Sequence, residues 1–311
     1  MRPDISVILP ARNEGARIAQ SIRSIARARS KQTRVEFVVV DDASTDGCSA
    51  NLLAAVPKLL EEPRIDIRMC RLDEHSGTYR TRNIGAELAS SDVLFMSDAH
   101  VRFSPRWDEV VLSHVEPGRI VAGVTVDDRA NTRGYGCRLT VPFMGASWNE
   151  EPSAPVAPVQ IAPCHATALT KELFMRLGGY DTEMLYYGGG EPEFSIRAWL
   201  HGAEILLVKE LEVRHHFREA DELDRFLDEV RPFSVRNRIR FGLLYLSENG
   251  CNQLIDYYAS EYPELIEDVL NDTNETDVWE RRAQLEQSCQ YSFDWFARRF
   301  DLRTETGEQV M

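Results

Sequence analysis

Short apolar runs alternate with helical patterns over the first hundred residues. The predicted strands are residues 5–9, 35–40, 65–69 and 93–97, and the predicted helices between them are residues 14–28, 49–62 and 81–89. In the first of these helices, Ile18, Ile22 and Ile25 fall on one face, as expected for a helix that packs on a sheet. Strands that alternate with helices are joined by crossovers and run parallel. This part of the chain therefore predicts an open α/β sheet.

The pattern loosens after residue 104 and becomes mainly helical after residue 219. Further helices are predicted at residues 107–114, 170–177 and 194–201, and further strands at residues 120–126, 205–208 and 211–213. An arginine-rich amphipathic segment then runs from residue 220 to about residue 248, and the acidic, aromatic remainder is predicted to be helical. We expect one α/β domain over residues 1–218. Residues 219–311 are expected to form a lid segment and a helical extension packed on the same domain.

The composition is that of a globular protein whose partners are not polyanions. The 311 residues are 43% hydrophobic, and no apolar run approaches the roughly 20 residues that span a bilayer. The net charge of −14 disfavours nucleic acids and anionic membranes as partners. No secretion signal precedes the first strand, and the six cysteines are scattered without a disulfide or zinc pattern. We therefore expect a cytoplasmic protein with reduced thiols.

Polar side chains gather at the predicted ends of three parallel strands. Pro10 and Arg12 follow the first strand, Asp42 the second, and Asp98 and His100 the fourth. Ligands of open α/β sheets collect at the carboxyl ends of their strands. Because Asp98 and His100 are two positions apart, both side chains of an extended segment point the same way and can hold one divalent cation. The alternatives are a solvated loop for this pair and a helix cap for Asp42.

Two later segments carry groups of similar chemistry. Glu191 and Glu193 stand at the start of a predicted helix, where carboxylates serve either as caps or as catalytic groups. His215 and His216 follow the last predicted strand. Because successive side chains of a strand alternate, at most one of these histidines can join a metal site.

In this order the segments resemble nucleotide-sugar glycosyltransferases of the GT-A fold, family 2-like, with motifs similar to the polypeptide N-acetylgalactosaminyltransferases. The resemblance covers residues 4–218. It rests on Ser-Val-Ile-Leu-Pro-Ala-Arg-Asn-Glu at 6–14, Val-Asp-Asp-Ala-Ser-Thr-Asp at 40–46, Gly-Thr-Tyr-Arg-Thr-Arg-Asn-Ile-Gly-Ala at 77–86, Ser-Asp-Ala-His at 97–100, Gly-Gly-Gly-Glu-Pro-Glu at 188–193 and Val-Arg-His-His-Phe-Arg at 213–218. It implies a GT-A sheet of the α/β class, open and mixed but mostly parallel and Rossmann-like, flanked by helices.

The resemblance also implies which residues bind the donor and the metal. The residues expected at a UDP-sugar donor are Pro10, Arg12, Glu14, Asp42, Arg80, Arg82, Ser97 and Asp98. Asp42 would accept a hydrogen bond from the uracil base, and each of the two later arginines either contacts the diphosphate or neutralises a nearby aspartate. Asp98, His100 and His215 would hold a divalent cation. Mixed imidazole and carboxylate ligands favour Mn²⁺, with Mg²⁺ as the alternative.

The helix-start motif implies the catalytic groups and departs from the family pattern at one position. Glu191 aligns with the general base of inverting family 2 enzymes, and Glu193 is expected to bond the acceptor or the donor sugar. Gly190 replaces the glutamate that precedes this base in the pattern. The N-acetylgalactosaminyltransferases, which retain configuration, have asparagine where Glu191 stands, so the carboxylate favours inversion.

The expected function is metal-dependent transfer of a sugar from a UDP-sugar to an acceptor hydroxyl, or less favourably a thiol. A glycan, a peptide and a small molecule remain open as acceptors, and a homo-oligomer is compatible with the aromatic C-terminal segment. One rival is a nucleotidyltransferase, which residues 10–13 disfavour because they form no glycine-rich phosphate loop. The other is a catalytically silent sugar-nucleotide-binding protein, which Gly190 supports. Arg236, Arg238 and Arg240 are expected either to close over the phosphates or to form surface ion pairs.

Overall fold

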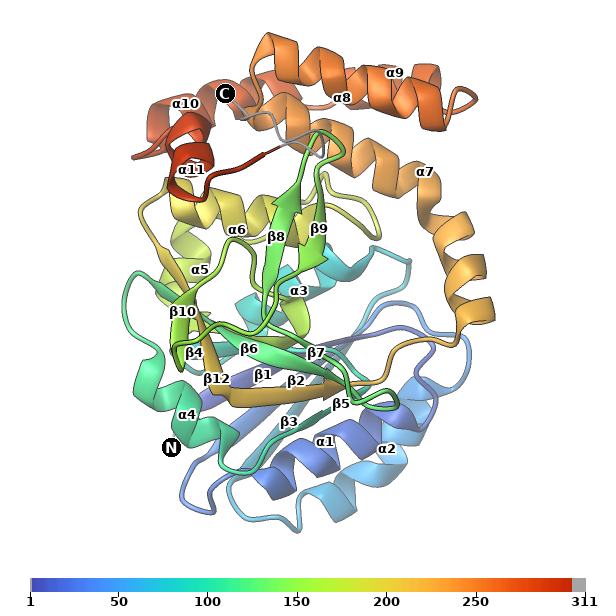
Figure 1. Cartoon of the computed structure of the whole chain (residues 1–311). Helices are drawn as coiled ribbons and strands as arrows, with labels where there is room; N and C mark the ends of the chain where they lie inside the picture. Colours follow the sequence, from blue (N-terminus) through green and yellow to red (C-terminus); the bar gives the residue numbers. More distant parts are fainter. Residues whose placement is uncertain (1, 304–311) are drawn as a thin grey trace.

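The computed structural model describes residues 2–303, and a large mixed sheet lies at its centre (Figure 1). The strands are β1 (Ile5–Ala11), β2 (Val35–Asp41), β3 (Ile65–Arg71), β4 (Val93–Met96), β5 (Val101–Phe103), β6 (Arg119–Asp127), β7 (Arg133–Gly134), β8 (Cys137–Thr140), β9 (Gly145–Trp148), β10 (Val156–Pro158), β11 (Thr167–Thr170) and β12 (Glu204–His215). The helices are α1 (Arg17–Ala28), α2 (Cys48–Leu59), α3 (Thr78–Leu88), α4 (Trp107–His114), α5 (Lys171–Arg176), α6 (Gly190–Leu200), α7 (Ala220–Tyr245), α8 (Glu248–Glu261), α9 (Ile266–Asn274), α10 (Val278–Ser288) and α11 (Phe293–Arg299).

The sheet order is β10-β12-β6-β11-β4-β1-β2-β3, with β5 paired to β12 and β7 paired to β6. Strands β3, β2, β1 and β4 are parallel neighbours, and β12 is parallel to β6. Strand β11 lies between the two groups and is antiparallel to both β4 and β6. Two antiparallel steps restore the direction, so β4 and β12 end at the same edge of the sheet. The structure confirms the expected α/β class and the mostly parallel, mixed sheet.

Alternating side chains of the strands build a core on each face of the sheet. Val7 and Leu9 of β1 pack with Ile18, Ile22 and Ile25 of α1. Ile8, between them in sequence, packs on the other face with residues of α3, α5 and α6. Helices α1, α2 and α4 thus cover one face and α3, α5 and α6 the other (Figure 1).

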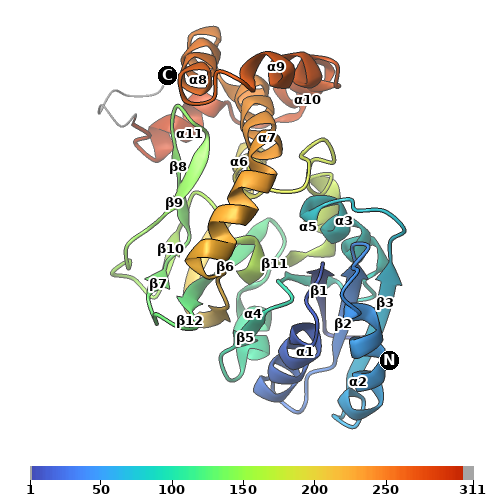
Figure 2. The ribbon, with the colours of Figure 1, turned by 90° about the vertical axis from the view of Figure 1, so that its right-hand side faces the viewer.

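The C-terminal helices form a layer beyond α6. Helix α7 leaves the end of β12 and runs along the molecule to α8, α9 and α10 (Figure 2). Helix α11 packs on α6. Buried side chains of these helices belong to the same hydrophobic cluster as Ile8 and Val38 of the sheet. No helix among residues 2–303 is long and apolar enough to cross a membrane.

The structure corrects several of the expected elements. The two strands expected at 205–208 and 211–213 form one strand, β12, whose register against β6 shifts between Val208 and Glu212. Helix α1 begins at Arg17, so Glu14 lies in the loop before it. Helix α6 begins at Gly190, before the expected start at residue 194, so Glu191 and Glu193 lie in its first turn. The short strands β5, β7, β10 and β11 and the β8–β9 hairpin were not predicted. Their short runs do not show the alternation of a strand that is buried on one face.

Candidate active site

The shared strand edge brings together the three residues that were expected to bind metal. Asp98 and His100 follow β4, and His215 is the last residue of β12. Their ligand atoms all lie within 4.8 Å of one another. The His215 Nε2 and Asp98 Oδ2 atoms are 3.0 Å apart, and the ring centroids of His100 and His215 are 4.8 Å apart. His216 points elsewhere, with its Nδ1 atom 4.0 Å from Asp128.

The buried Arg82 side chain compensates the charge of Asp98. Arg82 comes from α3, is 1% exposed, and forms an ion pair with the Asp98 carboxylate. Burial alone would raise the pKa of Asp98, but the Arg82 guanidinium and the contact with His215 outweigh it and hold that pKa well below its usual range. Asp98 is therefore a carboxylate near neutral pH. Of the two roles left open for Arg82, the structure shows the neutralising one.

Glu14 orients the second histidine of this cluster. The Glu14 Oε1 and His100 Nδ1 atoms are 3.0 Å apart. Burial alone would lower the pKa of His100, but the contact with Glu14 outweighs it and the pKa is raised. A carboxylate on one ring nitrogen fixes the tautomer and leaves Nε2 for a metal. Glu14 is thus placed behind a ligand and not among the ligands.

The donor set fits a divalent cation. Two imidazoles and one carboxylate are borderline ligands that suit Mn²⁺ or Zn²⁺ better than Mg²⁺. Ligand atoms held about 2.0–2.2 Å from a metal lie about 3 to 4.4 Å from one another, which the 4.8 Å limit of this cluster accommodates. The Nδ1 atom of His215 is buried and has no hydrogen-bond partner among residues 2–303.

Two residues beside the cluster were missed by the sequence analysis. Cys164 and His165 lie just before β11, and their ligand atoms lie within 4.8 Å of each other and of Asp98. The ring of His165 is 4.5 Å from that of His215, and its Nε2 atom is 2.8 Å from the Thr125 hydroxyl. Burial, followed by the nearby His215, holds the pKa of His165 well below its usual value, so His165 is neutral. Neither residue was identified from the sequence, because no motif marks it and the strand that follows, β11, was not predicted.

Glu191 lies in the first turn of α6, near the Cys164 thiol. Burial and the nearby Glu191 carboxylate raise the pKa of this thiol well above its usual value, and its Sγ atom lies within 4.8 Å of the Asp98 ligand atom. Tyr79 of α3 donates its hydroxyl proton to Glu191 Oε2 over 2.9 Å. The carboxylate is half-buried. The structure therefore brings Glu191 close to the metal cluster, as the motif suggested.

Glu193 lies in the core, away from this site. It is 0% exposed, and Arg197 donates to its two oxygens over 2.7 and 2.8 Å. The Tyr245 hydroxyl donates to Oε1 over 2.8 Å. Both carboxylate oxygens are thus satisfied by buried donors, which is the arrangement of a structural ion pair.

Asp42, the residue expected at the nucleotide base, holds a turn of the chain at residues 75–77. Asp42 is 3% exposed and accepts hydrogen bonds from the backbone amides of Ser76 and Gly77 over 2.6 and 2.9 Å. His75 Nδ1 is 2.6 Å from the same carboxylate, and the His75 ring lies 4.5 Å from that of Tyr186. The exposed Arg12 donates to the carbonyl of Asp42 over 2.7 Å. The Asp42 carboxylate therefore holds the 75–77 turn.

The remaining expected donor residues differ in exposure. Pro10 is half-buried in β1. Ser97 is fully buried and its hydroxyl contacts the carbonyl of Asp98 at 3.3 Å. Arg80 is exposed and has no hydrogen bond or ion pair with the part of the chain that the structure describes. It is the one of the two arginines of this motif whose side chain is open to a ligand.

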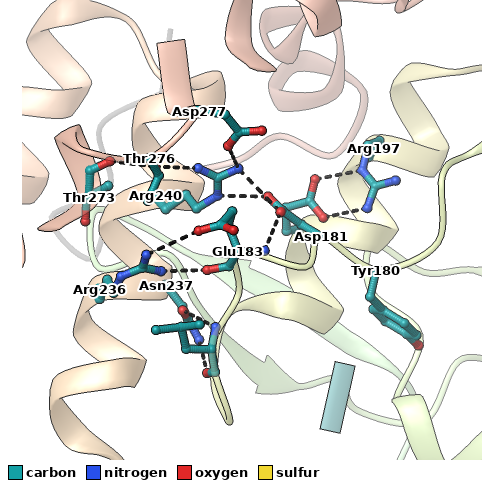
Figure 3. Close-up of polar contacts among 12 residues, drawn as sticks. Tyr180, Asp181, Glu183, Arg197, Arg236, Asn237, Arg240, Thr273, Thr276 and Asp277 are labelled. Carbon is teal, nitrogen blue, oxygen red and sulfur yellow. Dashed lines mark hydrogen bonds and ion pairs between the residues drawn. The ribbon is translucent and has the colours of Figure 1, made fainter. Parts of the chain in front are cut away.

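Arg236 and Arg240 of α7 bond residues between α5 and α6 and residues of the C-terminal segment (Figure 3). Arg240 donates to Asp181 over 2.9 Å and to Asp277 over 2.7 Å. Arg236 donates to the carbonyl of Glu183 over 2.6 Å and forms an ion pair with Asp272. Arg238 lies over the ring of Phe143. Of the two roles left open for these arginines, the structure shows ion pairs for Arg236 and Arg240 and a stacked position for Arg238.

Comparison with known proteins gives a family match over the same region. Residues 6–169, more than half of the chain, match the profile described as Glycosyl transferase family 2. The chain is 26% identical to human polypeptide N-acetylgalactosaminyltransferase 15, over 94% of this chain and 47% of that protein. It is 28% identical to polypeptide N-acetylgalactosaminyltransferase 8 of Drosophila melanogaster, over 79% of this chain and 44% of that protein. The chain thus spans less than half the length of these relatives.

Solved structures share the fold at low sequence identity. A crystal structure of GalNAc-T7 with UDP, GalNAc and Mn²⁺ superposes with a TM-score of 0.75 at 18% identity, covering 96% of this chain and 57% of that one. A mannosyltransferase from Pyrobaculum calidifontis with GDP-Man and Mn²⁺ gives a TM-score of 0.55 at 15% identity, covering 93% and 86%. These likenesses bear out the expected GT-A fold.

Proposed function

Because the chain belongs to glycosyl transferase family 2, we propose that it transfers a sugar from a UDP-sugar to an acceptor hydroxyl, with inversion and with Glu191 as the base. The observation that carries this proposal is that Glu191 and Asp98 of the metal cluster both lie near the Cys164 thiol. A base close to the site of the leaving group is what a displacement at a sugar carbon needs.

Asp98, His100 and His215 would hold the divalent cation, with Mn²⁺ as the preferred ion. When bound, the cation supplies positive charge to the departing diphosphate. The similar structures with UDP or GDP-Man and Mn²⁺ support this choice of ion and of donor class. Glu14 keeps the His100 ring oriented, and Arg82 keeps Asp98 ionised and in place.

The donor side is proposed to use the 75–77 turn and Arg80. Asp42 fixes this turn through three hydrogen-bonding contacts, so it shapes the site of the base while the turn and the His75 ring make the contacts. The exposed Arg80 is proposed to contact the diphosphate. Uridine is preferred over guanosine because the relatives at 26–28% identity are N-acetylgalactosaminyltransferases, and GalNAc-T7 was solved with UDP.

Glu191 acts as the base in this proposal. Its carboxylate accepts the acceptor proton while the acceptor oxygen attacks the anomeric carbon from the side opposite the diphosphate. The carbon–oxygen bond to the acceptor forms as the bond to the diphosphate breaks, which inverts the configuration. Glu193 takes no part, because its oxygens are bonded to Arg197 and Tyr245. Acceptors of the glycan, peptide and small-molecule classes all fit this chemistry.

The test is a donor screen that does not require the acceptor. UDP release from UDP-glucose, UDP-galactose and their N-acetyl forms is measured with and without Mn²⁺. We expect Mn²⁺-dependent release that falls by about 10²- to 10⁴-fold in both Asp98→Ala and Glu191→Gln. Glu204→Gln, an exposed position at the opposite end of β12 from His215, is the matched control and should keep full activity. UDP binding without turnover of any donor would instead indicate a silent sugar-nucleotide-binding protein.

A further inference from the structure

The position before the base is occupied by Gly190, and the neighbouring Tyr79 ring explains why. A Cβ atom at residue 190 would lie 2.5 Å from Cε1 and 2.7 Å from Cε2 of Tyr79. Contacts this short do not occur for real side chains, and the Tyr79 ring is 0% exposed and has no room to move. With Tyr79 present, residue 190 must be glycine. The glutamate of the family pattern and this tyrosine exclude each other.

The Tyr79 hydroxyl links the start of α6 to the carboxylate of its first turn. It accepts a hydrogen bond from the Gly190 amide over 3.1 Å and donates to Glu191 Oε2 over 2.9 Å. The Gly190 amide is one of the unpaired donors of a helix N-terminus, so the hydroxyl also serves as its cap. Burial, followed by the nearby Glu191, raises the pKa of Tyr79 well above its usual value, so the hydroxyl stays protonated and keeps donating.

We propose that Tyr79 is a positioning residue that holds the Glu191 carboxylate in the orientation needed to accept the acceptor proton. It takes the place of the acidic side chain that the family pattern has at position 190. A glutamate side chain has three rotatable bonds, and one strong hydrogen bond from a rigid, buried ring removes most of that freedom. The inference rests on the proposed function, because it assigns Tyr79 a role only if Glu191 is the base.

The experiment is kinetic analysis of Tyr79→Phe, which keeps the packed ring and removes only the hydroxyl. With saturating Mn²⁺ and the best UDP-sugar from the donor screen, we expect kcat to fall about 10- to 100-fold, as for loss of a hydrogen bond to a charged group. KM for the donor should change by less than about twofold, because Tyr79 contacts the base and not the donor residues. A kcat within about twofold of the wild type would overturn the proposal.

A double-mutant cycle separates positioning from a general loss of structure. If Tyr79 acts through Glu191, Tyr79→Phe added to Glu191→Gln should lower the residual rate no further. Fully additive effects would mean that Tyr79 acts independently of the base. The control is Tyr245→Phe, which removes the hydroxyl that donates to Glu193, the other carboxylate in the first turn of α6. This variant should leave kcat within about twofold of the wild type. If Glu191→Gln itself keeps full turnover, the base assignment fails, and that result is distinct from failure of the Tyr79 role.

Discussion

Glu191 and Glu193 show how much two positions along a helix change the role of a carboxylate. Residues i and i+2 of an α-helix point about 200° apart around its axis. Glu191 therefore faces Tyr79 and Cys164, whereas Glu193 faces Arg197 and Tyr245 in the core. The sequence places both at a helix start, so it could not separate them. Only their contacts in the folded chain do so, with Tyr79 of α3 for Glu191 and Tyr245 of α7 for Glu193.

The contact between Glu14 and His100 yields a prediction about metal affinity. Glu14→Gln keeps the size of the side chain but removes the charge that orients the His100 ring and raises its basicity. We expect the affinity for Mn²⁺ to fall by about 10- to 100-fold. Titration of Mn²⁺ followed by electron paramagnetic resonance of the free ion measures this directly. Wild-type affinity in Glu14→Gln would show that Glu14 does not support the metal site, and Glu204→Gln serves again as the control.

At the scale of elements, ion pairs of Arg236 and Arg240 hold helix α7 against the rest of the protein. Arg240 is 0% exposed and bonds Asp181, in the turn after α5, together with Asp277, before α10 (Figure 3). Burial alone would raise the pKa of Asp181, but the Arg240 guanidinium and its hydrogen bond outweigh it and lower that pKa. The buried Arg240 charge therefore joins three segments: helix α7, the turn after α5 and the residues before α10.

This pair predicts an acid-sensitive contribution to stability. Because the pKa of Asp181 is lower in the folded than in the unfolded protein, its stabilisation is present at neutral pH and is lost as the pH falls through the folded value. Asp181→Asn should lower the free energy of unfolding by about 3 kcal/mol at pH 7. The difference from the wild type should shrink below about pH 4, near the unfolded pKa. Urea unfolding between pH 7 and pH 3 measures both effects.

The control for this prediction is Asp92→Asn. Asp92 is 76% exposed and pairs with Arg2 at the surface, where an ion pair contributes little. Its unfolding free energy should match the wild type within about 0.5 kcal/mol at every pH. An Asp181→Asn difference that stays constant from pH 7 to pH 3 would contradict the assigned cause.

The sequence predicted the elements with strong periodicity and missed those defined by their neighbours. Strands β1 and β2 are continuous apolar runs, and α1 has a clear apolar face, so their patterns are local. Strand β11 has four residues, of which three are buried, and it pairs antiparallel on both sides. Nothing local marks it as a strand, and His165 went unnoticed beside it. The sequence likewise left two roles open for Arg240, because its partners are 59 and 37 positions away.

At the scale of the whole molecule, one hydrophobic cluster joins the sheet to the C-terminal helices. Leu254 and Tyr258 of α8, Val278 of α10 and Phe296 of α11 are at most 1% exposed and share a cluster with Ile8 of β1. Residues 219–303 therefore complete the core of the fold.

This shared core predicts that the C-terminal helices are required for folding. A chain ending at residue 246 would expose apolar side chains of α6 and α7 that the later helices bury. It should therefore lose cooperative thermal unfolding and bind a dye specific for exposed apolar surface. The full chain should unfold in a single transition seen equally by far-ultraviolet and near-ultraviolet circular dichroism. A shortened chain with a sharp transition and wild-type Mn²⁺ affinity would contradict this prediction.

The wide separation of Asp98 and His215 along the chain has a consequence for the order of events during folding. The two residues are 117 positions apart and meet only when β12 has paired with β6, and β11 with both β6 and β4. Closing such long loops is slow compared with forming local helices. High-affinity uptake of Mn²⁺ should therefore be among the last events of refolding. Its time course would report when the sheet is complete.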